Sequence, residues 1–585
     1  MLMTRKVLQV LKLVLLLTST LIGCDNTDTA PAIERPNIIL VMTDDQGIGD
    51  LGAAGNPVIE TPHLDRFAEE GVQMTTFYVS PVCAPTRASL MTGRYNYRTR
   101  VVDTYIGRAM MEPEEVTLAE VLRDAGYATG LFGKWHLGDN HPMRPQDQGF
   151  EEVLMHRGGG IGQPSDPPTG ENRYTDPVLF QNGVEKTFEG YCADLYFDQA
   201  KVWIEREPSA GRPFFAYISS NTPHSPYHDV PVDLYRKYYG RDLSGIMLGE
   251  GDDPDTLARI LAMVENIDQN MGRLLVRLDE LDVADDTIVI FMTDNGPNTM
   301  RYVADLRGMK GQVHGGGIRT SFFLRWPSRY ESGQKVDTMT AHIDVMPTLL
   351  EMVGVAAPPS LDGLSFAPEL EGRPPNRPER TIFIQSHRGD TPQLYHHVSI
   401  HTARWKLVNP SGFGRDRMEG EPQWELYDLS VDPGETNSLA DQNPQQLEIL
   451  KSRYEEWFED VSSTREENYA PPRIVVGSSE EPVSVLTRQD WRHLQGRPWA
   501  PDSNGVWKVY AENGGPYRVI ALLRAEADSV ELRWGDASWT EPVPDGVSEV
   551  VFDVDGIPAG PSDLMAVVRE SGAEYGPWHL NVERR

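Results

Sequence analysis

The sequence predicts an α/β protein whose large, mixed and mostly parallel sheet is sandwiched by helices. Two stretches, 37–43 and 287–293, are almost uninterrupted apolar runs, which are typical of strands buried on both faces. An amphipathic pattern over 257–281 indicates a long helix packed on such a sheet. Towards the C-terminus, short runs alternate between apolar and polar residues, which favours a β-sandwich at that end.

The chain divides into several predicted parts. Residues 36–375 are expected to form the main α/β domain. Residues 376–461 are expected to form a smaller antiparallel α+β subdomain, because the pattern there changes to short strands followed by one helix. A polar, proline-bearing stretch at 462–481 is the predicted linker. Residues 482–585 form the β-sandwich accessory domain, which we expect to be a packing or capping module rather than a glycan binder.

The N-terminus is typical of a bacterial lipoprotein signal peptide over residues 1–23. Arg5 and Lys6 precede an apolar run that is too short to span a bilayer, and this run ends in Leu21-Ile22-Gly23-Cys24, which resembles a lipobox. We therefore expect lipidation of Cys24, a tether over 24–35 and a location in the bacterial cell envelope, facing the periplasm or the cell surface. Contact with the membrane would be through the lipid anchor only. Ordinary signal cleavage followed by release is the alternative.

Charge and cysteine content exclude several classes of function. The formal charge is −33 at pH 7, so a nucleic-acid partner is excluded and any affinity for anions has to be local. The chain has three cysteines, Cys24, Cys83 and Cys192. With Cys24 lipidated and Cys83 modified, as argued below, no disulfide is expected.

Oxygen-bearing side chains follow the two most apolar predicted strands. Asp44 and Asp45 come directly after the first strand, and Asp294 and Asn295 directly after the later one. Ligands gather at the carboxyl ends of parallel strands, and adjacent carboxylates there suit a hard divalent cation. An Asp-Asp pair alone is more often a turn or a helix cap, but two strands that deliver four oxygen side chains strengthen the prediction of a metal site.

Cys83 is expected at the N-terminus of a short helix. Pro85 suits the first turn and Gly93 the end of that helix, with Arg87 one turn after the cysteine. Free backbone N–H groups and a guanidinium would favour negative charge beside the sulfur. The competing interpretation is a small buried cysteine at a helix terminus.

The motif around Cys83 resembles the signature of the type I, formylglycine-dependent sulfatases, which are arylsulfatase-like members of the alkaline phosphatase superfamily. Cys-x-Pro-x-Arg starts at Cys83 and is followed by Leu-x-Thr-Gly-Arg at 90–94. Gly-Lys-Trp-His at 133–136, Pro-His-x-Pro at 223–226 and Lys310 match further motifs of the family. The resemblance covers roughly residues 36–460.

The resemblance implies a complete set of site residues. Asp44, Asp45, Asp294 and Asn295 would hold calcium, or sometimes magnesium. A formylglycine-generating maturation enzyme would convert Cys83 to 3-oxoalanine (formylglycine), which attacks the sulfur. The remaining catalytic residues would be Arg87, Lys134 and Lys310 for electrostatics, His224 with Lys310 for protonation of the leaving group, and His136 for the proton removal that ejects sulfate. Lys134 and His136 are expected on one side of an extended segment.

One position departs from the family pattern. Many relatives carry an acidic residue where this chain has Gly315. An ion pair or hydrogen bond assumed from the family is therefore in doubt at that position.

The expected substrate is a sulfated carbohydrate, because of the predicted envelope location, the additional β-domain and a loop-rich stretch at 141–195. His156, Arg157 and His314 are candidates for substrate contacts. Two other functions compete: a phosphomonoester or phosphonate ester hydrolase of the same superfamily, and a non-catalytic, glycan-binding lipoprotein in which Cys83 is never oxidised. The sequence specifies neither the sugar nor the sulfated hydroxyl, nor endo or exo action, nor the oligomeric state.

Overall fold

The computed structural model describes residues 35–585 except 168–169, 171, 208–210, 250–252, 375–378 and 416. The predicted signal peptide and the lipidation site Cys24 lie outside the described residues. The elements named below all belong to one compact unit, residues 37–585. No helix within the described ranges is long and apolar enough to cross a bilayer.

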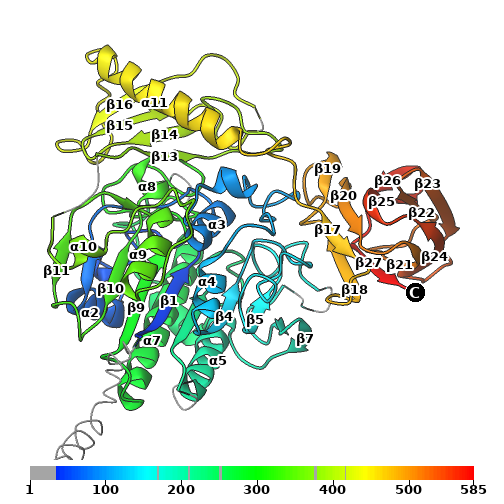
Figure 1. Ribbon diagram of the computed structural model, residues 1–585, viewed down its shortest axis with the longest axis horizontal. Helices are drawn as coiled ribbons and strands as arrows, with labels where there is room; N and C mark the ends of the chain where they lie inside the picture. The colour runs from blue at the N-terminus through cyan, green and yellow to red at the C-terminus, as the bar shows by residue number, and fades with distance from the viewer. Residues whose placement is uncertain are drawn as a thin grey trace, which may run out of the picture. The chain divides into compact units, whose positions relative to one another are not determined.

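A ten-stranded mixed sheet forms the centre of the catalytic domain (Figure 1). Its strands, in spatial order, are β11 (Gln334–Val336), β2 (Val72–Met74), β10 (Phe322–Arg325), β9 (Thr287–Thr293), β1 (Asn37–Thr43), β8 (Phe214–Ser219), β4 (Ala128–Lys134), β5 (Glu152–His156), β6 (Val178–Gln181) and β7 (Val184–Thr187). The five strands from β9 to β5 are parallel to their neighbours within that group. β10, β6 and β7 run antiparallel to their neighbours. The predicted fold class is confirmed.

Helices cover both faces of this sheet. Because successive side chains of a strand point to opposite faces, Ile38 and Leu40 of β1 join one core and Ile39 and Val41 the other. The first core contains residues of α3 (Cys83–Thr92), α4 (Leu118–Asp124) and α9 (Val345–Met352). The second contains residues of α2 (Pro62–Glu70), α5 (Cys192–Arg206) and α7 (Pro254–Glu280). Both faces of β1 are therefore buried, which accounts for its uninterrupted apolar run.

Short elements complete the catalytic domain. They are β3 (Phe77–Tyr78), β12 (Thr340–Ala341), α6 (Val232–Tyr238), α8 (Gly315–Ile318), α10 (Ala367–Leu370) and the 3-10 helices at 52–54, 96–99 and 342–344. β3 and β12 pair as a small parallel ladder beside the main sheet.

The smaller subdomain is an antiparallel sheet covered by one helix. Its strands follow each other in order as β13 (Ile382–Gln385), β14 (Val398–His401), β15 (Trp405–Asn409) and β16 (Glu425–Asp428). Helix α11 (Pro444–Ser462) packs its buried residues Leu450 and Tyr454 into the same core as Ile382 and Ile400. Tyr97 of the catalytic domain belongs to this core as well, so the two parts share buried surface.

Two sheets with one shared core form the C-terminal β-domain. The first sheet contains β17 (Ile474–Val476), β19 (Arg492–Gln495), β20 (Asn504–Ala511), β22 (Ser529–Trp534), β23 (Ala537–Pro542), β25 (Gly560–Glu570) and β26 (Ala573–Tyr575). The second contains β18 (Val483–Thr487), β27 (His579–Arg584), β21 (Gly515–Leu522) and β24 (Glu549–Ile557). This is the predicted β-sandwich.

The predicted linker at 462–481 is wrong in its second half. Strand β17 lies inside that range and pairs in parallel with β20. Ile474 and Val476 are completely buried, because their side chains enter the core of the sandwich. The β-domain therefore begins several residues before the predicted boundary at 482.

Candidate active site

The carboxyl ends of adjacent strands bring the predicted metal ligands together. Thr43 and Thr293 are paired in the β1–β9 ladder, so the residues that follow them leave the sheet side by side. The backbone N–H of Asp45 donates to Oδ1 of Asp294 at 3.2 Å, and Nδ2 of Asn295 donates to Oδ1 of Asp45 at 2.8 Å. Asp44, Asp45, Asp294 and Asn295 are all at most 1% exposed.

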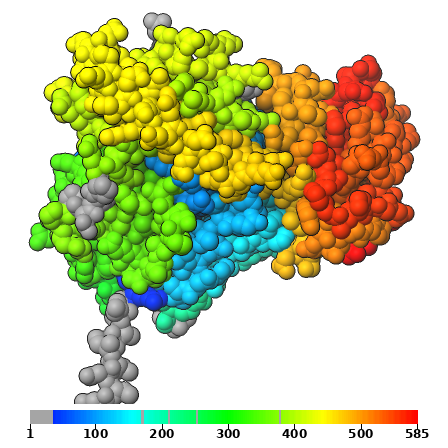
Figure 2. All heavy atoms as spheres, turned by 45° about the horizontal axis from the view of Figure 1, so that its top comes forward, coloured from blue at the N-terminus to red at the C-terminus, as the bar shows by residue number. Residues whose placement is uncertain are grey.

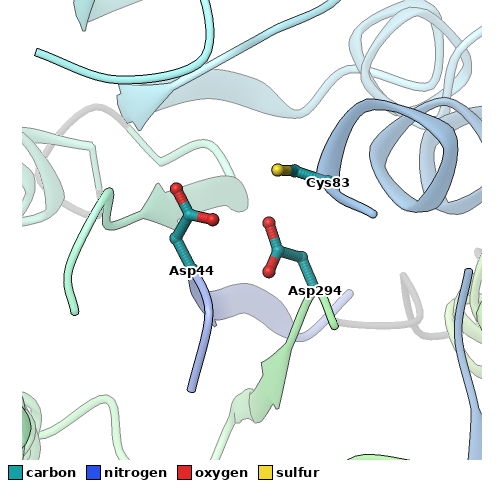
Figure 3. A group of neighbouring side chains, drawn as sticks. All are labelled: Asp44, Cys83 and Asp294. Atoms are coloured by element: carbon teal, nitrogen blue, oxygen red, sulfur yellow. The ribbon is translucent and has the colours of Figure 1, made fainter. Parts of the chain in front are cut away.

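The donor set at this position fits a hard divalent cation. Oδ1 of Asp44 and Oδ1 of Asn295 are buried, and within the described part of the chain neither has a hydrogen-bond partner. One ligand atom each from Asp44, Cys83 and Asp294 lie within 4.8 Å of one another, as do ligand atoms of Asp44, Asp45 and His224. Figure 3 shows the first of these groups pointing into one common space. Burial and the neighbouring Asp44 raise the pKa of Asp294 to about 6, which a bound cation would reverse.

Cys83 is the first residue of α3, as predicted, and Gly93 ends that helix in a left-handed conformation. The side chain is 2% exposed. Burial raises the pKa of the Cys83 thiol, although Lys134 and Lys310 act in the opposite direction. An unmodified Cys83 is therefore protonated at neutral pH and a poor nucleophile.

Arg87 and Lys134 form ion pairs with the carboxylates of Asp294 and Asp44. Nη2 of Arg87 lies 2.8 Å from Oδ2 of Asp294, and its Nη1 donates to Oγ of Ser219 at 2.6 Å. Nζ of Lys134 lies 2.6 Å from Oδ2 of Asp44, and both side chains are 0% exposed. Neither cation is among the described residues that line the cavity above Cys83, although Lys134 acts to lower the pKa of the Cys83 thiol.

Lys310 and His224 face the cavity beside Cys83. Nζ of Lys310 lies 2.6 Å from Oδ1 of Asp45, and Nε2 of His224 lies 3.7 Å from Oδ2 of the same carboxylate. Nδ1 of His224 lies 2.6 Å from the carbonyl oxygen of Ser225. Burial and the neighbouring Lys310 lower the pKa of His224 to about 4.

His136 lines the same cavity but does not lie on an extended segment. Its φ is +60°, so the prediction that Lys134 and His136 share one side of an extended segment is wrong; the chain turns directly after β4. Nε2 of His136 lies 2.8 Å from the carbonyl oxygen of Thr104, which fixes the proton on that nitrogen. Burial and the adjacent Lys134 hold the pKa of His136 well below 6.5.

The three predicted substrate contacts lie elsewhere. His156 is buried at the end of β5, and Arg157 stacks over Phe180 at 4.4 Å. Nε2 of His314 lies 3.2 Å from Oε2 of Glu425. None of the three lines the cavity formed by the described residues, and their contact with substrate stays a prediction.

A carboxylate remote in sequence occupies the position next to Gly315. Oε1 of Glu435 accepts a hydrogen bond from the N–H of Gly315 at 2.7 Å and lies 2.7 Å from Nζ of Lys406. A Cβ on Gly315 would lie 2.9 Å from this oxygen. The smaller subdomain thus supplies a buried carboxylate beside Gly315.

The cavity above Cys83 has a volume of about 890 Å³. Besides Cys83, His136, His224 and Lys310 it is lined by residues that the sequence did not single out, among them Tyr105, Asn172, His228, Arg388, Phe413 and Trp499. No Asp or Glu side chain occurs in this lining among the described residues, although the protein carries a charge of −33. The described lining therefore carries the positive charges of Lys310 and Arg388 without a carboxylate among them.

The comparison with protein families decides the identity. A family model described as "Sulfatase" matches residues 36–355, and one described as "N-sulphoglucosamine sulphohydrolase, C-terminal" matches residues 309–461. The chain belongs to the sulfatase family. It is a sulfuric ester hydrolase of the alkaline phosphatase superfamily.

Relatives of this sulfatase occur in animals and bacteria. It is 30% identical to arylsulfatase A of Homo sapiens, over 72% of this chain and 87% of that protein. It is 28% identical to an N-acetylgalactosamine-6-O-sulfatase of Bacteroides thetaiotaomicron, over 74% and 96%. The solved structure of Ps i-CgsB in complex with k-i-k-neocarrahexaose has a TM-score of 0.63 and 23% identity, covering 75% of this chain and 95% of that one. About a quarter of the sulfatase therefore lies outside each of these alignments.

Proposed function

We propose that this sulfatase removes sulfate from a sulfated carbohydrate, either a polysaccharide or an oligosaccharide. The observation that carries the proposal is the cavity, which combines Cys83, His136, His224 and Lys310 with Arg388 and has no acidic side chain in its described lining. The relative from Bacteroides thetaiotaomicron, an N-acetylgalactosamine-6-O-sulfatase, supports a sugar substrate. The volume of about 890 Å³ exceeds the needs of a sulfate group alone.

The proposed cofactors are formylglycine at position 83, produced by a formylglycine-generating enzyme, and Ca²⁺, or alternatively Mg²⁺. Asp44, Asp45, Asp294 and Asn295 would hold the cation, with the two unpaired oxygens at Asp44 and Asn295 as the strongest support. When bound, the cation supplies charge neutralisation for the sulfate oxygens, and formylglycine supplies an attacking hydroxyl.

Side chains of the protein would supply the remaining positive charge and the proton transfers. Lys310 holds positive charge at the cavity surface, where its partner Asp45 keeps it in place. His224 and Lys310 both lie beside Asp45 and would together protonate the leaving oxygen, with Lys310 carrying the proton at neutral pH because the pKa of His224 is lowered to about 4. His136 is neutral at pH 7 with its proton on Nε2, so that its buried Nδ1 is the atom that accepts a proton.

The test is sulfate release from a panel of defined sulfated oligosaccharides with Ca²⁺ in excess. The sulfate ester and the phosphate ester of one chromogenic phenol are assayed in parallel. We expect release of inorganic sulfate from at least one oligosaccharide. Preference for the phosphate ester by more than tenfold over the sulfate ester would overturn the proposal.

We also propose that lipidated Cys24 anchors the enzyme in the bacterial envelope. The support is the lipobox-like end of the N-terminal apolar run. Fractionation of cells that produce the protein tests this: the wild type should sediment with membranes, and Cys24→Ala should release it. An unaltered distribution of the variant would refute the anchor.

A further inference from the structure

One wall of the catalytic cavity comes from the C-terminal β-domain. Trp499 lies between β19 and β20 of that domain and lines the cavity together with Tyr105 and Arg388 of the family-matched part of the chain. Its ring meets that of Tyr105 edge-to-face, with 5.2 Å between the centroids. In Figure 2 the orange atoms of the β-domain abut cyan atoms of the catalytic domain.

The segment that carries Trp499, residues 488–499, is fixed to the catalytic domain by specific contacts. The carbonyl oxygen of Gln489 accepts a hydrogen bond from the N–H of Gly107 at 2.9 Å. Nε2 of Gln489 donates to the carbonyl oxygen of Thr104 at 2.8 Å. Arg488, Gln489 and Asp490 are at most 3% exposed. These contacts fix the β-domain against the catalytic domain, so that it forms part of the cavity wall. The sequence alone predicts only a packing or capping role for this domain.

Trp499 itself adopts an unusual backbone conformation. Its φ is +66°, which is uncommon for a bulky residue and is found where the surroundings enforce it, often at binding sites. Pro498 and Pro501 flank the turn and restrict its backbone. The indole is half-buried, and its Nε1 is buried without a hydrogen-bond partner in the described ranges.

Arg388 gives this part of the cavity its charge. Its Nη1 donates to Oδ1 of Asp103 at 2.5 Å and to Oγ1 of Thr104 at 3.0 Å. A guanidinium has five N–H donors, so these contacts, which involve the described residues only, leave the donors on Nε and Nη2 for a ligand. The side chain is 29% exposed, and its guanidinium lies 5.1 Å from the centre of the Tyr105 ring.

We infer that Trp499, Tyr105 and Arg388 form a subsite for the sugar next to the sulfated one, and that this neighbouring sugar carries a carboxylate or sulfate of its own. The inference rests on the proposed function. The aromatic rings provide an apolar wall for the face of a sugar ring, and Arg388 pairs with the anionic group. The absence of acidic residues from the described lining of the cavity favours such a polyanionic ligand.

Two substrates of different length test the subsite. The first is 4-nitrophenyl sulfate, which has a single ring, and the second is a sulfated uronic-acid-containing tetrasaccharide on which the wild type releases sulfate. For Trp499→Ala we expect the ratio of kcat/KM for the tetrasaccharide to kcat/KM for 4-nitrophenyl sulfate to fall at least tenfold, mainly through KM. Trp499→Phe should restore most of the ratio, and Arg388→Gln should lower it on the uronic-acid substrate.

The matched control is Tyr510→Ala, which removes an exposed aromatic side chain of the same domain that does not line the cavity. It should leave the ratio unchanged. A Trp499→Ala variant that loses both activities equally, or neither, would overturn the subsite.

Binding of a sulfated uronic-acid-containing tetrasaccharide to Cys83→Ala, measured by calorimetry whether or not the wild type releases sulfate from it, separates this result from the proposed function. Weaker binding to Cys83→Ala/Trp499→Ala than to Cys83→Ala supports the subsite even if no sulfate is released. Equal affinities would refute it.

Discussion

Nζ of Lys134 lies 2.6 Å from Oδ2 of Asp44, and neither side chain is exposed to solvent. The other oxygen of Asp44 has no hydrogen-bond partner in the described part of the chain. Asp44 therefore uses one oxygen for a protein cation and keeps the other available at the candidate metal position. The pair connects the ends of β1 and β4, which are both adjacent to β8 in the sheet.

Removal of this lysine should destabilise the protein strongly. In Lys134→Met the carboxylate of Asp44 remains buried without its cation, and the loss of one partner of a buried ion pair costs about 3–5 kcal/mol. We expect that decrease in the free energy of unfolding, measured by urea denaturation after dialysis against a chelator. Lys508→Met is the control, because its partner Asp563 is half-exposed and such a pair contributes about 1 kcal/mol or less. Equal free energies of unfolding of Lys134→Met and Lys508→Met would contradict the view that Lys134 compensates the buried charge of Asp44.

Metal binding and turnover should fall together when Asp294 loses its charge. Asp294→Asn keeps the size of the side chain but removes an anionic ligand and the partner of Arg87. We expect affinity for Ca²⁺ to fall by roughly 100-fold or more, since changes at residues that only support a metal ligand already cost about 10–100-fold. Calorimetric Ca²⁺ titration and sulfate release measure the two effects. The exposed Asp282→Asn is the control, and full turnover of Asp294→Asn would refute its role as a ligand.

Gly315 and Gly245 should respond in opposite ways to alanine. A Cβ at Gly315 would lie 2.9 Å from Oε1 of Glu435, whereas a Cβ at Gly245 meets nothing within 4 Å. We expect Gly315→Ala to lower the free energy of unfolding by about 1–3 kcal/mol through overpacking. Gly245→Ala should be neutral or add up to about 1 kcal/mol by restricting the unfolded chain. Urea unfolding of both variants checks this, and a neutral Gly315→Ala would show that Glu435 moves aside at no cost.

The free energy of unfolding should depend on pH through Asp268, a buried residue of α7. Burial raises the pKa of Asp268 to about 7, and its Oδ1 accepts from the N–H of Leu64 at 2.7 Å. Between about pH 4 and 7 the folded protein keeps a proton on Asp268 that the unfolded chain releases, so the wild type loses this stabilisation as the pH rises towards 7. Asp268→Asn has no such dependence.

The stability of Asp268→Asn relative to the wild type should therefore increase from pH 5 to 7 and stay constant above that. Thermal unfolding of both proteins between pH 5 and 9 measures the difference. A difference that does not change with pH would contradict the raised pKa.

Local sequence patterns predicted the parts of the site that follow strand ends. The residues after β1 and β9 converge because two apolar runs become neighbouring parallel strands, and apolar periodicity is visible in the sequence. Cys83 begins a helix because Pro85 and Gly93 favour its start and its end. These features depend on a few consecutive residues each.

Contacts between parts remote in sequence were not predictable in this way. Trp499 reaches the cavity through the docking of the β-domain, and no pattern around Arg497-Pro498-Trp499 indicates which surface it will meet. Glu435 reaches Gly315 from the smaller subdomain in the same manner. The left-handed turn at His136 also has no marker, because the residue is not a glycine.

Conversion of Cys83 to formylglycine is the step on which the proposed sulfatase chemistry depends, and peptide mass spectrometry of the active enzyme detects it. In that conversion the side chain loses sulfur and two hydrogens and gains one oxygen. Treatment with a hydrazide before digestion labels the aldehyde, iodoacetamide labels any remaining thiol, and Cys83→Ala serves as the blank. The account predicts a hydrazide adduct at position 83 whose amount follows the sulfatase activity across preparations. An active preparation in which position 83 is found only as the alkylated thiol would contradict it.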